Sequence, residues 1–258
     1  MLTYGVEDGI MVARLDDGAT NAVSLETLEA LKAAIDAVND TPEIKGLILT
    51  GTGRFFSSGF SLPFFAGFES EDEVVAFFEA EEAILMDLFT CSKPVVSAIN
   101  GHCAAMGLIM SMAADYRIVK DHPKIKLGMS EIKIGLALSV AQSGVVRFGA
   151  DSDKKFRDLM YFGEMMDVNR ARELELVDEL AADEAALMAR AREIVCLWID
   201  TPNRPFIQIK RALKQDTAER IQGELDRGEW KAPLATTLMN PEVKATLEFV
   251  QAAMMQKK

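Results

Sequence analysis

The chain has 258 residues, of which 49% are hydrophobic and 26% are charged, so it carries enough apolar side chains to bury the core of one or two domains. Its net charge of −12 argues against nucleic acid or an anionic membrane surface as the main partner, because both attract a surplus of Lys and Arg. The sequence lacks the roughly 20 uninterrupted apolar residues of a membrane span, and its N-terminus lacks the basic segment of an export signal, so a cytoplasmic protein is expected.

The first half of the chain alternates strand and helix patterns, which is typical of an α/β domain. An Asp8-Gly9 turn joins two expected strands, and Ser24 can cap a helix whose apolar residues recur at spacings of three and four. A capping-box pattern at Ser70 opens a second long helix. The segment 51–67, rich in glycine and aromatic residues, is expected to form neither helix nor strand. The predicted strands are 4–7, 10–15, 46–50, 95–99, 115–120 and 124–127, and the predicted helices are 25–38, 70–89 and 105–113.

The second half of the chain is predicted to be mostly helical. A proline-flanked segment, 201–205, is the best candidate boundary, because the residues after it carry few strand patterns. We therefore expect an α/β core over residues 1–200 and a helical region over residues 201–258. The predicted helices are 153–161, 169–175, 183–198, 206–225 and 241–255.

Cysteine and histidine are too sparse to indicate a metal site. Cys91, Cys103 and Cys196 are widely spaced and odd in number, which fits reduced thiols better than a disulfide framework. His102 and His122 are the only histidines, so a zinc site is not expected.

Two segments of the α/β core place a glycine-containing turn after a buried strand. One follows the strand at 46–50 and contains Gly59, and the other follows the strand at 95–99 and contains Gly101 and Gly107. Ligands of open α/β sheets bind at the carboxyl ends of strands, and free backbone N–H groups in such turns suit a developing oxyanion. Glycine turns are also common as purely structural features, so this pattern alone leaves both interpretations open.

Glu131 is the candidate acid or base. It lies among apolar residues that include Leu127, Ile132 and Ile134, and burial among them would raise the pKa of its carboxyl toward neutrality. The alternative is a surface glutamate paired with Lys133.

Three ordered segments carry a resemblance to a known family. They read F-S-S-G-F-S-L over Phe56–Leu62, A-I-N-G-H-C-A-A-M-G over Ala98–Gly107, and G-M-S-E-I-K-I-G over Gly128–Gly135. With their spacing they resemble the enoyl-CoA hydratase/isomerase (crotonase) family, and the resemblance covers nearly the whole chain. It implies a crotonase-like α/β spiral of ββα turns and a C-terminal helical region that forms a homotrimer or a dimer of trimers. It also implies an acyl-CoA thioester ligand and a place in fatty-acid β-oxidation.

The resemblance assigns roles to particular positions. The backbone N–H groups of Phe60 and Met106 would hold the thioester oxygen, and Glu131 would be the acid/base. The acyl-CoA would lie along a set of residues from both glycine turns: Ser58, Gly59, Phe60, Ser61, Leu62, Pro63, Met106 and Gly107.

Departures from the family pattern narrow the expected reaction. Ile109 stands where hydratases of this family carry the first of two carboxylates, so Glu131 remains alone. One base beside an oxyanion hole suits moving a proton between two carbons better than adding water. The segment 98–135 is most similar to the Δ3,Δ2-enoyl-CoA isomerase branch. Met106 replaces a glycine, and Ser61 replaces an aspartate.

We therefore expect an isomerase in which Glu131 removes a C2 proton and returns it to C4, with no metal or redox cofactor. One alternative is a hydratase that uses another carboxylate, such as Glu69 or Glu164. The others are a different acyl-CoA reaction, such as thioester hydrolysis or decarboxylation, and a non-catalytic acyl-CoA-binding protein whose site Met106 has closed. The acyl chain length is not predicted.

Overall fold

The structure is a computed structural model that describes the backbone of residues 1–255 and the side chains of residues 1–253. Two sheets lie at its centre. The larger sheet has the strand order β1-β2-β3-β5-β7-β10, in which only the β1–β2 pair is antiparallel. Its strands are β1 (Leu2–Glu7), β2 (Ile10–Leu15), β3 (Leu47–Gly51), β5 (Val95–Ile99), β7 (Tyr116–Lys120) and β10 (Glu179–Ala181).

The smaller sheet follows the larger one strand by strand. Its order is β4-β6-β8-β9, with parallel pairing except between β8 and β9. Each of β3, β5 and β7 is followed along the chain by one strand of this sheet and then by helix, which makes three successive ββα turns. This confirms the predicted α/β spiral. The strands are β4 (Phe55–Ser57), β6 (His102–Ala104), β8 (Lys126–Gly128) and β9 (Met165–Asp167).

Helices cover both faces of the larger sheet. On one face, α8 (Glu184–Ile199) packs through Leu187, Ala191 and Val195 against apolar strand residues such as Ile48 and Val96. The main core lies on the other face of this sheet. A sheet buried on both faces explains why its parallel strands read as continuous apolar runs. The remaining helices of the core are α1 (Leu25–Asp40), α2 (Leu62–Ala66), α3 (Glu71–Thr90), α4 (Met106–Ala113), α5 (Val140–Gly149), α6 (Asp153–Phe162) and α7 (Val168–Glu173).

The N-terminal caps form largely as predicted. The Ser24 hydroxyl accepts a hydrogen bond from the Thr27 N–H at the start of α1, and Ser70 caps α3 through the Glu73 N–H. The reciprocal bond of the predicted capping box is displaced by one residue, because the Glu73 carboxyl accepts from the N–H of Glu69.

The prediction for residues 51–67 is wrong. This segment contains strand β4, which pairs with β6, and the short helix α2, which has Pro63 near its start. Both elements are stabilised by pairing and packing with distant residues, and three to five residues are too few to show a period of their own. The prediction also omitted β6, α5, β9, β10 and α10 (Lys231–Met239).

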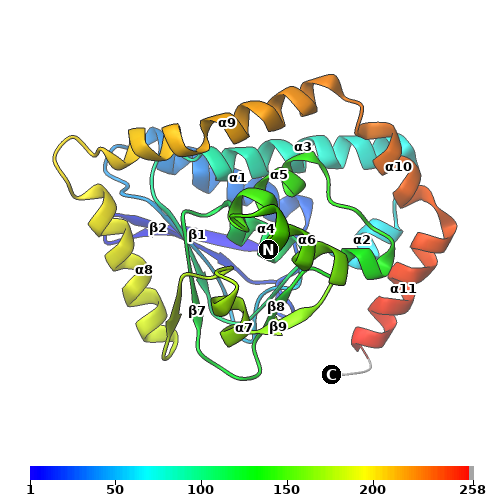
Figure 1. Cartoon of the computed structure of the whole chain (residues 1–258), viewed down its shortest axis with the longest axis horizontal. Helices are drawn as coiled ribbons and strands as arrows, with labels where there is room; N and C mark the ends of the chain where they lie inside the picture. The colour runs from blue at the N-terminus through cyan, green and yellow to red at the C-terminus, as the bar shows by residue number, and fades with distance from the viewer. Residues whose placement is uncertain (256–258) are drawn as a thin grey trace.

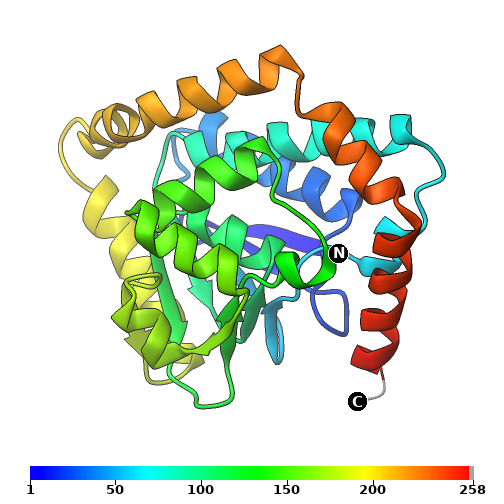
Figure 2. The same ribbon diagram turned by 45° about the vertical axis from the view of Figure 1, so that its right-hand side comes forward.

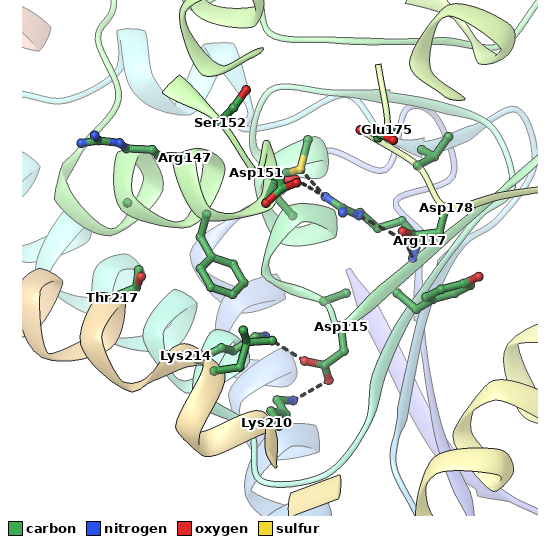
Figure 3. Close-up of a pocket in the computed structure, with 18 of the residues that line it drawn as sticks. Asp115, Arg117, Arg147, Asp151, Ser152, Glu175, Asp178, Lys210, Lys214 and Thr217 are labelled. Atoms are coloured by element: carbon green, nitrogen blue, oxygen red, sulfur yellow. Dashed lines mark hydrogen bonds and ion pairs between the residues drawn. The ribbon is translucent and has the colours of Figure 1, made fainter. Parts of the chain in front are cut away.

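The C-terminal helices wrap around the core. Figures 1 and 2 show α9 (Phe206–Arg227) lying along α3, with α10 and then α11 (Pro241–Met255) descending toward α2. Two buried lysines anchor α9, since the Nζ atoms of Lys210 and Lys214 lie 2.6 and 2.9 Å from the carboxylate of Asp115 (Figure 3). No helix among the described residues is long and apolar enough to cross a membrane.

Candidate active site

The three motif segments meet at one place in the fold. Gly59 adopts a φ of +94°, and a Cβ atom there would lie 2.6 Å from the Cβ of Ala105 and 3.2 Å from the backbone N of Met106. Only glycine fits both the conformation and the contact. The N–H of Ala105 in turn donates to the carbonyl of Gly128, at 3.1 Å, where the segment that carries Glu131 begins. The two glycine turns and the glutamate segment therefore form a single site.

Two backbone N–H groups at this junction have no hydrogen-bond partner among the described residues. Val23 donates to the carbonyl of Gly59 and accepts from the N–H of Ser61, so the intervening N–H of Phe60 is left unused. Met106 is the first residue of α4, where N–H groups have no acceptor within the helix. None of the backbone hydrogen bonds found between described residues uses either N–H. These are the two groups that the family resemblance assigns to an oxyanion hole.

Ala105 has a strained backbone at the start of α4. Its φ of 51° and ψ of −128° lie in a region that residues other than glycine rarely occupy, at a cost of about 1–3 kcal/mol. This conformation directs the chain from β6 into α4 and so positions the N–H of Met106. The Met106 side chain is 1% exposed and belongs to the main core.

Glu131 is buried and has an uncompensated carboxyl oxygen. It begins a 3-10 turn, Glu131–Ile134, and is only 9% exposed, so its interpretation as a surface residue is wrong. Burial raises the pKa of its carboxyl to about 7, although the N–H groups of Glu131 and Ser130 partly offset the effect. Its Oε2 atom is buried without a hydrogen-bond partner, and no ion pair with Lys133 occurs among the described side chains. Such a carboxyl can exchange a proton near neutral pH.

The predicted acyl-CoA segment leads away from this junction. Ser58 is fixed by hydrogen bonds of its N–H and hydroxyl to Thr20, each 3.0 Å long. Leu62 and Pro63 line a groove of about 420 Å³ between α2 and α11. On the opposite turn, a Cβ atom on Gly107 would lie 2.7 Å from that of Ser57, so the glycine allows α4 to pack closely against β4.

The comparisons with known proteins agree with this geometry. The family model for enoyl-CoA hydratase/isomerase matches residues 5–237. The chain belongs to the enoyl-CoA hydratase/isomerase family. The mitochondrial enoyl-CoA delta isomerase 1 of Homo sapiens is 23% identical over 84% of this chain and 72% of its own length. A probable enoyl-CoA hydratase of Mycolicibacterium paratuberculosis is 30% identical over 85% of each chain. The crystal structure of the human mitochondrial Δ3-Δ2-enoyl-CoA isomerase superposes with a TM-score of 0.90, at 21% identity, over 100% of this chain and 99% of its own.

The fold is therefore crotonase-like, as that structural similarity shows. Relatives named as isomerases and relatives named as hydratases both match this chain, so membership of the family leaves the reaction open.

The residues considered for the second carboxylate of a hydratase are not placed as that role requires. Ile109 is fully buried on α4, while Glu69 and Glu164 are exposed. The sequence analysis missed Glu81 and Glu82, which are both buried on α3. A pattern could have found them, because they follow two buried phenylalanines by four residues and so share the apolar face of the helix.

Phenylalanine rings line the region next to Phe60. Its ring centroid lies 4.9 Å from that of Phe65 and 5.5 Å from that of Phe77, and Phe64, Phe68 and Phe78 extend the cluster. Phe60, Phe64, Phe65 and Phe68 therefore belong to one aromatic cluster. Phe55 lies elsewhere, against His102, and the imidazole of His102 accepts a hydrogen bond from the N–H of Lys126.

A larger cavity, of about 1120 Å³, lies at the base of α9 and contains none of the predicted site residues. Its charged side chains mostly neutralise one another. Asp115 faces Lys210 and Lys214, and Arg117 lies 3.5 Å from Asp178 (Figure 3). We therefore interpret this cavity as a gap in the packing interface between α9 and the core, and not as a ligand site.

Proposed function

We propose that the chain is an enoyl-CoA isomerase, which moves a double bond of an acyl-CoA thioester from C3–C4 to C2–C3. The observation that carries this proposal is a buried carboxyl, Glu131, on a segment hydrogen-bonded to the junction of two turns, each of which has one unused N–H group. A proton carrier and an oxyanion hole are the two elements that such a reaction needs.

The mechanism begins with the thioester oxygen, which accepts hydrogen bonds from the N–H groups of Phe60 and Met106. These bonds make the C2 protons more acidic, and the carboxylate of Glu131 removes one of them. The product is a dienolate whose negative charge rests on the thioester oxygen. One oxyanion-hole donor typically contributes about 10²–10³ in rate. Protonation at C4 then gives the 2-trans-enoyl-CoA. These proton transfers need no metal or redox cofactor.

The surroundings of Glu131 support isomerisation over hydration. Ile109 offers no group to orient or deprotonate water. Glu69 and Glu164, the two alternative carboxylates, are exposed, which does not support a role for either as the second carboxylate of a hydratase. Within the family, a site that lacks the paired carboxylates of a hydratase is better suited to proton transfer between carbons.

A panel of thioesters tests this proposal. The purified protein is incubated with 2-enoyl- and 3-enoyl-CoA thioesters of several chain lengths, and the products are identified by mass spectrometry and absorbance. We expect 3-enoyl-CoA to be converted to 2-enoyl-CoA, with slower or no formation of 3-hydroxyacyl-CoA. Hydration without isomerisation would contradict the proposal.

We also propose that the chain assembles as a trimer through its C-terminal helices. Leu197 on α8 and Ile209 and Leu213 on α9 are more than half exposed, which is unfavourable for large apolar side chains left in water. Light scattering after size exclusion should give three times the chain mass of 28.4 kDa, or a multiple of that. Leu213→Glu should shift the protein toward monomer, and a wild-type protein that is monomeric would contradict this assignment.

A further inference from the structure

Ser57 is a buried serine that lies between the two turns of the candidate site. It is the last residue of β4 and is 0% exposed. Its hydroxyl accepts a hydrogen bond of 3.1 Å from the N–H of Gly59 and donates one of 2.7 Å to the backbone carbonyl of Asn21. A serine hydroxyl has a single proton to donate, so the bond to Asn21 leaves the oxygen lone pairs for Gly59.

The same side chain also contacts the second turn. A Cβ atom on Gly107 would lie 2.7 Å from the Cβ of Ser57 and 3.2 Å from its hydroxyl oxygen. Gly107 directly follows Met106 in the first turn of α4. Ser57 is therefore bonded to the turn that carries the N–H of Phe60 and packed against the turn that carries the N–H of Met106.

Segment 20–23 lies along segment 58–61 and limits which of its N–H groups are free. Its carbonyl groups accept two of them, and the hydroxyl of Ser57 accepts a third. The three N–H groups that are bonded in this way are those of Ser58, Gly59 and Ser61. Within segment 58–61, the N–H of Phe60 is thus left without a partner among the described residues.

Gly59 needs restraint on both sides, because glycine rotates freely about its backbone bonds. The hydroxyl of Ser57 holds the peptide that precedes Gly59, and the N–H of Val23 holds the peptide that follows it, through a bond of 2.8 Å to the carbonyl of Gly59. The carbonyl and the N–H of a trans peptide point in opposite directions, so the N–H of Phe60 points away from Val23. The hydrogen bonds around Gly59 therefore determine the direction of this donor.

The acceptor that orients Ser57 is itself held in place. Asn21 is 2% exposed, and its side-chain amide donates to the carbonyls of Thr52 and Phe55, at 3.0 and 2.7 Å. These two residues flank the connection between β3 and β4. The backbone carbonyl of Asn21 is thereby fixed relative to β4, and with it the direction of the Ser57 hydroxyl.

We propose that Ser57 is a positioning residue of the oxyanion hole. Its hydroxyl orients the turn that presents the N–H of Phe60, and its Cβ atom supports the turn that presents the N–H of Met106. The inference rests on the proposed function, which assigns these two N–H groups to the thioester oxygen. Because Ser57 is fully buried, it acts through the two donors. Its loss should therefore weaken stabilisation of the charge on the thioester oxygen and leave the affinity for acyl-CoA nearly unchanged.

Ser57→Ala tests the proposal, since it removes the hydroxyl with little change in volume. Steady-state kinetics on a 3-enoyl-CoA give kcat and KM. The second measurement is the infrared carbonyl stretch of a bound saturated acyl-CoA labelled with ¹³C at the thioester carbon. Donors in an oxyanion hole polarise this carbonyl and lower its stretching frequency. The matched control is Ser97→Ala on β5, a serine that is also 0% exposed and whose hydroxyl is bonded to Ser111, at 2.8 Å.

We expect Ser57→Ala to lower kcat by about 10–100-fold with KM nearly unchanged, because displaced donors lose much of their effect on the transition state. The carbonyl frequency of the bound thioester should move back toward that of the free thioester. Ser97→Ala should change neither quantity, although it also loses a buried hydrogen bond. The inference is overturned if Ser57→Ala keeps the wild-type kcat, if its carbonyl frequency equals that of the wild type, or if Ser97→Ala has the same effects.

Ser57→Cys provides the test if Ser57→Ala does not fold. The thiol has a similar shape but is a weak donor and a weak acceptor, so kcat should again fall and the carbonyl frequency should lie between the wild-type and free values. Wild-type values of both in Ser57→Cys would overturn the inference, and so would a wild-type complex whose carbonyl frequency equals that of the free thioester.

The infrared comparison needs only binding, so it separates this inference from the proposed function. Failure of the wild-type protein to isomerise any 3-enoyl-CoA would contradict the proposed function. The carbonyl frequencies of the wild type and Ser57→Ala would still decide whether Ser57 positions the two donors.

Discussion

Gly59 and Ala105 lie in direct contact across the two turns that form the candidate oxyanion hole, so that a Cβ atom on Gly59 would lie 2.6 Å from that of Ala105. The contact sets the separation of the two N–H groups that follow, those of Phe60 and Met106. Since the φ of Gly59 is +94°, the turn is restricted both by its conformation and by its neighbour.

Gly59→Ala should therefore impair the site more than it impairs the fold. The added methyl group separates the two turns, and misplaced donors lose most of their effect on the transition state. We expect kcat to fall by at least about 100-fold, with KM changed much less. Steady-state kinetics on a 3-enoyl-CoA measure both values. Gly18→Ala, at a positive φ but with open space around the added methyl group, is the control for backbone strain alone.

Ala105→Gly should stabilise the protein. The positive φ of Ala105 destabilises the folded state by about 1–3 kcal/mol. Glycine removes this strain, and the extra conformational entropy that it gives the unfolded chain costs less than that. We expect the free energy of unfolding to rise by about 1 kcal/mol in urea denaturation. An unchanged or lower stability would show that the conformation of Ala105 is not strained.

The pH dependence of catalysis should follow Glu131. Its carboxyl must be ionised to remove the C2 proton, and burial raises its pKa to about 7. We expect kcat/KM to increase tenfold per pH unit below that value and to level off above it. A profile that is flat between about pH 5.5 and 8.5 would contradict the assignment of Glu131 as the base.

Stability should change in the opposite direction with pH. The folded protein holds the Glu131 proton up to about pH 7, whereas the unfolded chain releases it near pH 4.5, the ordinary pKa of a glutamate side chain. The folded state therefore binds more protons between these values, and the free energy of unfolding falls as the pH rises through this window. In Glu131→Gln this fall in the free energy of unfolding should be absent, because glutamine does not titrate. The variant should be more stable than the wild type at pH 8, by up to about 3 kcal/mol, and no more stable at pH 4.

The interaction of Asp115 with two lysines should hold α9 in place. Asp115→Asn leaves the charges of Lys210 and Lys214 buried with only carbonyl partners, a change that typically costs about 3–5 kcal/mol. We expect a matching loss in the free energy of unfolding and faster amide exchange in α9. Asp158→Asn, at a surface ion pair, should cost less than about 1 kcal/mol.

The sequence predicted the fold well where elements carry their own pattern. The caps at Ser24 and Ser70 and the apolar strands at 46–50 and 95–99 are local features, and each appears within one or two residues of its predicted place. Strand β4 and helix α2 could not be predicted in this way, because they depend on distant residues. Strand β4 pairs with β6, and α2 packs on α11 and on phenylalanines of α3.

The candidate site divides in a similar manner. The family resemblance carried by the three motifs was enough to choose Phe60, Met106 and Glu131, and the structure brings their segments together. Glu81 and Glu82 were missed because, in the sequence, they belong to an acidic helix whose other carboxylates face water. Their burial depends on α5, a helix that the sequence analysis did not predict.

The most direct test of the central claim is the rate at which Glu131→Gln converts a 3-enoyl-CoA to the 2-enoyl isomer. Gln is nearly the same shape as Glu but cannot accept a proton at neutral pH, so the site should still bind the thioester. We expect kcat to fall by at least about 10³-fold, in the range that a general base contributes, with little change in the affinity for acyl-CoA. A Glu131→Gln variant that isomerises at the wild-type rate would contradict the account.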